Sequence, residues 1–221
     1  MKKFAVVIGG CGHKDGSEIQ ETVSALLAMS KAGIEYQCFS VDCLAKDYVN
    51  HITDESDGDV RNLLTEAARI ARGDIKPLNE LNVQDFDALV LPGGFGVAKN
   101  YMSYAFDGVN GTIRDDIKAI ILDFHKSKKY IGAICISPVL LAFAFKDSGI
   151  KIKITVGTTA NRSVFDHVEK LGGEAVAKES SEICIDAPNR IVTTPAYMND
   201  ASIFTVYTGI ELLINHIAEN S

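Results

Sequence analysis

A cysteine stands where a predicted strand turns abruptly into a helix. The segment from Tyr130 to Ile134 is a short apolar run that ends at Cys135, and Pro138 suits the first turn of a following helix. Small residues, Ala133 and Ser137, lie two positions to either side of Cys135. A nucleophile on a tight strand-to-helix turn needs such neighbours, because bulky side chains would collide there. The spacing therefore predicts a nucleophile elbow that carries a thiol.

The thiol of Cys135 would then lie at a helix N-terminus, where the positive end of the helix dipole favours the thiolate and lowers the thiol pKa. Such a sulfur is nucleophilic near neutral pH. A buried cysteine that only fills space at a strand end is the alternative interpretation. The position of Cys135 at the carboxyl end of a strand favours the interpretation as a reactive thiol, since open α/β sheets bind ligands at this end of their strands.

A glycine-rich turn, Pro92-Gly-Gly-Phe-Gly96, follows a second predicted strand. Glycines allow backbone N–H groups to approach a ligand closely. Together with the amide of Ile136, this turn is suited to form an oxyanion hole. A turn that only requires positive φ values explains the same glycines. The glycine turn therefore indicates an oxyanion hole only in combination with Cys135.

An acid and two histidines are the candidates for proton transfer. Glu18 directly follows Ser17, the predicted N-cap of the helix after the first strand, and so lies at the carboxyl edge of the sheet within reach of Cys135. An ordinary charge–dipole interaction of about 0.3–1 kcal/mol explains an acid at this position equally well. Of the five histidines, only His13 and His51 are placed to join a site.

Short apolar runs separated by helical patterns must position these groups. Strands are predicted over residues 4–8, 36–41, 88–91, 130–134, 152–156 and 190–193. Helices are predicted after Ser17 up to Gly33, over 60–70, and from Ile203 to Ile217. Alternating strands and helices indicate an α/β sandwich, a mostly parallel sheet with helices on both faces.

The chain is expected to form one domain over residues 1–221. Its 221 residues suffice to form a hydrophobic core that needs no disulfide or metal ion for stability, and the chain contains no internal repeat. About forty-five residues separate the second strand from the strand at 88–91. They include a polar stretch at 50–59 and an amphipathic helix, which indicates an excursion from the core sheet at about 44–84.

The composition excludes several classes of partner. A net charge of -7 without a basic run argues against nucleic acid and against anionic membranes, and no apolar stretch reaches the ~18 residues of a membrane span. Five scattered cysteines without zinc spacing predict no metal and a reducing cytosol. Only Lys2 and Lys3 precede the first strand, so no export signal is predicted and a cytoplasmic location is expected.

A nucleotide cofactor is a further alternative. The glycines at 10, 12 and 16 follow the first strand, and Asp42 lies where a ribose-binding acid is found in dinucleotide-binding folds. The spacing is not G-x-G-x-x-G, and the residues His13, Lys14 and Asp15 do not suit a tight phosphate turn. No cofactor is therefore predicted.

In combination these features resemble the class I glutamine amidotransferase-like superfamily, in the branch of the Parkinsonism-associated deglycase and the PfpI-type proteases. The chain is most similar to the ElbB family, named for enhancing lycopene biosynthesis. The resembling segments span nearly the whole chain: Gly10-Cys-Gly12, Asp15-Gly-Ser-Glu-Ile19, Asn50-His51, Arg61-Asn62, Glu66-Ala-Ala-Arg-Ile70, Leu91-Pro-Gly-Gly-Phe-Gly96, Ala98-Lys-Asn100, Cys135-Ile136 and Thr193-Thr-Pro-Ala-Tyr-Met198.

The resemblance implies a flavodoxin-like, usually dimeric sandwich that acts on small dicarbonyls. It makes Cys135 the nucleophile, hydrogen-bonded to Glu18, with the amides of Gly94 and Ile136 near the substrate oxygen. Further candidates for lining the site are Cys11, His13, His51, Lys99 and Asn100. The family branches commonly have histidine directly after the nucleophile, whereas this chain has isoleucine, which disfavours protease and amidotransferase activity.

The function predicted on these grounds is a cofactor-independent glyoxalase. The Cys135 thiolate adds to a 2-oxoaldehyde such as glyoxal or methylglyoxal, and the hemithioacetal rearranges to a thioester that water releases as a 2-hydroxy acid. Glu18 is the expected proton shuttle, with His13 or His51 as substitutes. The alternative is a non-catalytic redox sensor or binding protein in which Cys135 is oxidised.

Overall fold

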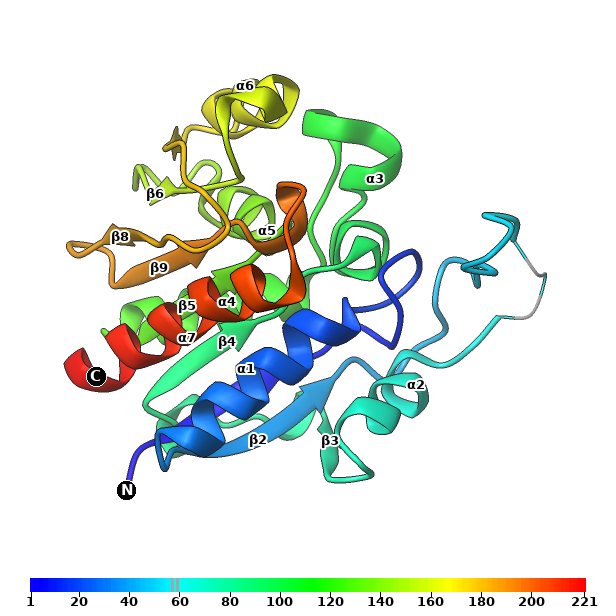
Figure 1. Cartoon of the computed structure of the whole chain (residues 1–221), viewed down its shortest axis with the longest axis horizontal. Coiled ribbons are helices and arrows are strands. Elements are labelled where there is room, and N and C mark those ends of the chain that lie inside the picture. Colours follow the sequence, from blue (N-terminus) through cyan, green and yellow to red (C-terminus); the bar gives the residue numbers. More distant parts are fainter. Residues whose placement is uncertain (57, 59) are drawn as a thin grey trace.

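A seven-stranded sheet runs through the centre of the molecule (Figure 1). The computed structural model describes residues 1–56, 58 and 60–221, so Asp57 and Asp59 of the predicted polar stretch lie outside the described residues. The strand order is β3-β2-β1-β4-β5-β9-β8, and each neighbouring pair is parallel except β8 with β9. The predicted α/β sandwich with a mostly parallel sheet is confirmed.

The strands of this sheet are short and mostly buried. They are β1 (Lys3–Val7), β2 (Glu35–Ser40), β3 (Ile75–Pro77), β4 (Ala88–Leu91), β5 (Tyr130–Ile134), β8 (Cys184–Asp186) and β9 (Ile191–Thr194). Sequence patterns missed β3 and β8, which are three residues long and form the two edges, where few apolar residues are needed. The strand β3 lies inside the segment 44–84 and pairs with β2.

The strand predicted at 152–156 does not join the main sheet. Its ordered part, β6 (Lys153–Ile154), pairs instead with β7 (Glu174–Ala175) in a separate two-stranded sheet. The following residue, Thr155, donates its amide to the side-chain hydroxyl of Thr193 at 2.9 Å. The amide of Lys153 likewise donates to the side chain of Asp186 at 2.7 Å. Side chains of β8 and β9 thus take the place of backbone acceptors, so β6 forms no backbone ladder with the main sheet.

Helices cover both faces of the sheet (Figure 1). They are α1 (Ile19–Lys31), α2 (Leu63–Ile70), α3 (Tyr104–Asp107), α4 (Asp115–Lys126), α5 (Ser137–Phe145), α6 (Arg162–Lys170) and α7 (Ile203–Asn220). Alternate residues of β1 enter two separate apolar cores, because strand side chains point to opposite faces. One core contains Phe4 and Val6 with α1 and α7, and the other contains Ala5 and Val7 with α4 and α5. None of the helices described is long and apolar enough to cross a membrane.

Helix α1 buries a different face from the one its large apolar residues suggest. Val23 and Leu27 are about half exposed, whereas Ala25 and Ala28 are buried against the sheet and α7. Glu21 precedes these alanines by one and two helical turns, so it shares their buried face. The small alanines allow the helix to approach closely, and the same geometry carries a carboxyl group inside the protein.

The chain order places several loops at one end of the sheet. After β1 the chain builds β2 and β3 on one side, and later adds β4, β5 and β9 on the other. The point between β1 and β4 is therefore a topological switch point, where the connections diverge and leave a crevice outside the strand ends. The loop after β1, the turn after β4 and Cys135 after β5 meet in this crevice.

Candidate active site

Cys135 occupies a tight turn between β5 and α5. Its φ of 62° lies in the left-handed region, which a non-glycine residue adopts only at an energetic cost. The turn is fixed on both sides: the amide of Cys135 donates to Thr194 O at 3.0 Å, and the hydroxyl of Ser137 donates to Pro92 O at 2.6 Å. Pro138 stands in the first turn of α5. The local geometry is that of a nucleophile elbow, with the sulfur aimed into a pocket.

The carboxyl group beside this sulfur belongs to Glu21. Its side chain is fully buried and hydrogen-bonded to the Cys135 thiol. The two carboxyl oxygens also accept backbone amides, Oε2 from Gly93 at 3.1 Å and Oε1 from Tyr197 at 3.3 Å. Loops after β4 and β9 thus hold the carboxyl in a single orientation against the thiol.

Burial changes the acidity of both groups. It raises the pKa of Glu21 to about 8, and the nearby charge of Glu18 adds to this effect. It also raises the pKa of the Cys135 thiol, as does a charge on Glu21, while the amides of Gly94 and Ile136 donate to the sulfur and lower it. The prediction of a lowered thiol pKa is thus wrong for the resting site, because desolvation outweighs the helix terminus. Since Glu21 titrates near neutral pH, both its acid and its base forms are accessible.

Glu18 is not the hydrogen-bond partner of Cys135. It is the N-cap of α1, in the position predicted for Ser17, and its carboxylate accepts the backbone amide of Glu21 at 2.6 Å. Ser17 is instead fully buried, where its hydroxyl accepts the amide of Gly9 at 2.8 Å. Glu18 still borders the pocket, and partial burial raises its pKa. The helix thus carries one acid at its cap and another, one turn later, at the thiol.

The glycine turn after β4 is shaped by close contacts. A Cβ atom on Gly93 would lie 2.5 Å from Cys135 Cβ and 2.7 Å from Glu21 Oε2. One on Gly94, whose φ is +103°, would lie 2.4 Å from the backbone of Glu18. Neither position has room for a side chain, which is what brings the turn against the sulfur. The amides of Gly94 and Ile136 donate to the sulfur of Cys135, so both N–H groups lie at the atom to which a substrate carbonyl would add.

We expect Gly93→Ala to disrupt the site through this steric conflict. The added methyl group must displace Cys135 or Glu21, so we expect a loss of about 1–3 kcal/mol in the free energy of unfolding and loss of thiol reactivity. Gly149→Ala is the control for thiol reactivity: its φ of +76° makes an added methyl group strained, but nothing lies within 4 Å of that group, so the stability should fall while alkylation of Cys135 stays unchanged. Urea unfolding and Cys135 alkylation of both variants test this. Unchanged alkylation in Gly93→Ala would contradict the packing described.

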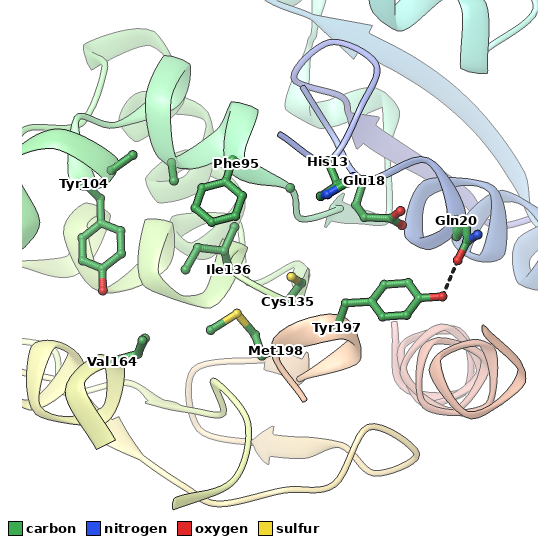
Figure 2. A pocket seen from close by; sticks show the side chains of 13 residues that line it. His13, Glu18, Gln20, Phe95, Tyr104, Cys135, Ile136, Val164, Tyr197 and Met198 are labelled. Carbon is green, nitrogen blue, oxygen red and sulfur yellow. Dashed lines mark hydrogen bonds between the residues drawn. The ribbon is translucent and has the colours of Figure 1, made fainter. Parts of the chain in front are cut away.

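The pocket above the sulfur has a volume of about 620 Å³. Figure 2 shows Cys135 near its centre, with polar groups to one side and apolar groups to the other. Its lining residues are His13, Glu18, Gln20, Gly94, Phe95, Ala98, Tyr104, Ala105, Cys135, Ile136, Val164, Tyr197 and Met198. The sequence indicated no role for Gln20, Phe95, Tyr104, Val164, Tyr197 or Met198, because these residues come from five separate segments that meet only in the fold.

The two candidate histidines form a pair at the edge of the pocket. His13 lines it, and the ring of His51 packs edge-to-face against His13 with centroids 4.9 Å apart. Burial, and then the neighbouring His51, lower the pKa of His13, so its imidazole is neutral at pH 7. His51 supports the loop after β1, since its Nε2 accepts the amide of Lys14 at 3.3 Å. His13 alone can face a ligand.

The remaining candidates hold the loop after β1 in place instead of lining the pocket. Lys99 Nζ donates to Lys14 O at 2.8 Å and pairs with Asp47 at 2.6 Å. Asn100 donates to Asp15 O at 3.3 Å. Cys11 borders a second cavity of only about 20 Å³. Among the described residues, no cluster of three or more histidine, cysteine or acidic side chains is arranged to hold a metal ion.

The fold and the elbow define a class I glutamine amidotransferase-like protein with a cysteine in the nucleophile position. Residues 11–206 match the DJ-1/PfpI family, and the chain belongs to this family. A crystal structure of an isoprenoid biosynthesis protein with an amidotransferase-like domain from Ehrlichia chaffeensis is 39% identical, with a TM-score of 0.92 and 99% of both chains covered. The narrower assignment to the ElbB family stays a prediction.

Two curated relatives extend the comparison to animals. Glutamine amidotransferase-like class 1 domain-containing protein 3, mitochondrial, of Homo sapiens is 34% identical over 98% of this chain and 82% of its own length. The ES1 protein homolog, mitochondrial, of Rattus norvegicus is 34% identical over 98% and 83%. These names overturn the predicted cytoplasmic location, because both relatives are mitochondrial proteins. Composition and cysteine usage did not distinguish one reducing compartment from another.

Proposed function

We propose that the protein is a cofactor-independent glyoxalase that converts 2-oxoaldehydes such as glyoxal and methylglyoxal into 2-hydroxy acids. One observation carries the proposal: the sulfur of Cys135 lies at a pocket, hydrogen-bonded to a buried carboxyl whose pKa is about 8. A proton-transfer group is most effective when its pKa is near the working pH. Membership of the DJ-1/PfpI family agrees with such chemistry.

The first step is addition of Cys135 to the aldehyde. The Glu21 carboxylate takes the thiol proton as the C–S bond forms and then returns this proton to the aldehyde oxygen, which gives a hemithioacetal and leaves Glu21 as a carboxylate again. The amides of Gly94 and Ile136, which contact the sulfur in the resting site, are placed to stabilise the negative charge that develops on this oxygen. No oxidant is consumed, since the thiol only adds across the carbonyl.

The second step is an internal redox exchange between two carbons. Glu21 moves the proton of the carbon attached to sulfur to the ketone oxygen, and then moves the proton of the hemithioacetal hydroxyl to the former ketone carbon. The first carbon is thereby oxidised and the second reduced. An enediol is the intermediate and a 2-hydroxyacyl thioester is the product. Water then cleaves the thioester, which releases the 2-hydroxy acid and restores the thiol. His13, neutral and at the pocket edge, is placed to activate this water.

The test is formation of lactate from methylglyoxal by the purified protein without added thiol or metal. We expect steady turnover that Cys135→Ala abolishes, because the covalent intermediate cannot form. Cys43→Ala is the matched control, since Cys43 is a free cysteine that does not line the pocket, and its activity should equal that of the wild type. A wild-type protein without turnover would refute the glyoxalase proposal and leave peroxide oxidation of Cys135 as the alternative to examine.

A further inference from the structure

The pocket has far more room than a three-carbon substrate fills. At about 620 Å³ it lies within the range of roughly 300–1,000 Å³ that is typical of sites for drug-sized ligands. Methylglyoxal bound to Cys135 would leave most of this space to water. The position of the unused space relative to the sulfur therefore indicates what else the substrate carries.

The lining is divided in two at Cys135 (Figure 2). On one side lie His13, Glu18, Gln20 and Tyr197, all with polar tips. On the other side lie Phe95, Tyr104, Ile136, Val164 and Met198, a region that we call the apolar arm. Ala105, which also lines the pocket, directly follows Tyr104 in α3. A substrate attached to Cys135 through its aldehyde carbon has these polar side chains on one side and the apolar arm on the other.

Two side chains show that the arm is suited to an apolar ligand. Phe95 is 56% exposed although it lines the pocket, so a large aromatic surface faces water until a ligand covers it. The hydroxyl of Tyr104 is hydrogen-bonded to His167 Nδ1 on α6 at 2.8 Å. Since α6 satisfies this polar atom, the ring is left as an apolar wall of the arm.

Resting on the proposed function, we infer that the preferred substrates are 2-oxoaldehydes whose ketone carbon bears an extended apolar group, such as an alkyl chain or an aryl ring. The aldehyde carbon bonds to Cys135 and the apolar group lies in the arm. The reaction is the same redox-neutral isomerisation followed by thioester hydrolysis, with water as the co-reactant. Burial of each methylene raises kcat/KM by about three- to four-fold until the arm is filled.

The experiment compares methylglyoxal with alkylglyoxals of increasing chain length. In the wild type we expect kcat/KM to rise with chain length to at least about ten-fold above that for methylglyoxal. Ala105→Trp places an indole in the arm from an exposed position on α3, so the ratio of long-chain to methylglyoxal kcat/KM should fall about ten-fold. Ala32→Trp, at the exposed C-cap of α1, should leave the ratio unchanged. Equal kcat/KM across the wild-type series would overturn the inference.

A second measurement separates this inference from the proposed function. Chloroacetamide and N-hexyl-chloroacetamide alkylate cysteine without any turnover, and mass spectrometry reports the labelling of each residue. We expect the hexyl reagent to be favoured at Cys135 by at least about ten-fold over its preference at Cys43, and this factor to fall in Ala105→Trp. Equal preference at the two cysteines would overturn the apolar arm, whatever the glyoxalase assay shows.

Discussion

Replacing Glu21 with glutamine should lower methylglyoxal turnover by about 10²- to 10⁴-fold, the usual contribution of a general acid–base group. Glutamine has nearly the size of glutamate, so the side chain still fills its buried site. It has no proton to give or take near neutral pH, and both steps of the proposed reaction pass a proton through this carboxyl. The effect should appear in kcat as well as in kcat/KM, because the proton transfers follow substrate binding.

Glu18→Gln is the matched control for Glu21→Gln. Both acids lie on the same helix one turn apart, but Glu21 is hydrogen-bonded to the thiol, whereas the carboxylate of Glu18 caps the helix by accepting the amide of Glu21. We expect Glu18→Gln to lower the free energy of unfolding by no more than about 1 kcal/mol and to reduce turnover far less than Glu21→Gln does. Melting temperatures measured alongside the rates exclude misfolding as the cause. A larger loss in Glu18→Gln than in Glu21→Gln would reverse the two roles.

The second large effect concerns stability and pH. Glu21 has an ordinary pKa of 4.5 when unfolded and a pKa of about 8 in the fold. Between these values the unfolded chain releases a proton that the folded protein retains, so the free energy of unfolding must fall as the pH rises. At about 1.4 kcal/mol per pH unit, the contribution lost from pH 4.5 to 8 is on the order of 4 kcal/mol. It is fully present below pH 4.5.

Urea unfolding from pH 5 to pH 8 isolates this contribution when the wild type is compared with Glu21→Gln. The variant lacks the titrating group, so its stability should fall less over the range, by on the order of 3–4 kcal/mol. Contributions from other groups, such as the lowered pKa of His13, are common to both proteins and cancel in the difference. The variant loses a hydrogen bond to Gly93 or Tyr197 at every pH, because an amide nitrogen replaces one acceptor oxygen. Parallel pH profiles would show that Glu21 is ionised in the folded protein.

Several parts of the fold and the site could be predicted from the sequence because they depend on local patterns. The elbow at Cys135 requires small residues and a proline at fixed positions close in the chain. The parallel sheet follows from short apolar runs between helical segments, each of which has its own period. Short edge strands such as β8 lack that signal, since one of their sides has no neighbouring strand and the apolar run is brief.

The identity of the carboxyl beside the thiol was decided by tertiary structure. Glu18 and Glu21 both stand in the first turn region of α1, and the large residues Val23 and Leu27 indicate the wrong buried face. The alanines at 25 and 28 were the available signal, because they share a face with Glu21.

Which face is buried depends on how closely α1 can approach the sheet and α7, and that is a property of packing between segments far apart in the chain. The sequence by itself determined the cysteine elbow and the sheet that presents it, since both follow from local spacing. Only the folded chain determined the acid beside that nucleophile, its pKa, and the apolar arm. These depend on burial and on segments that meet only once the β-strands have paired.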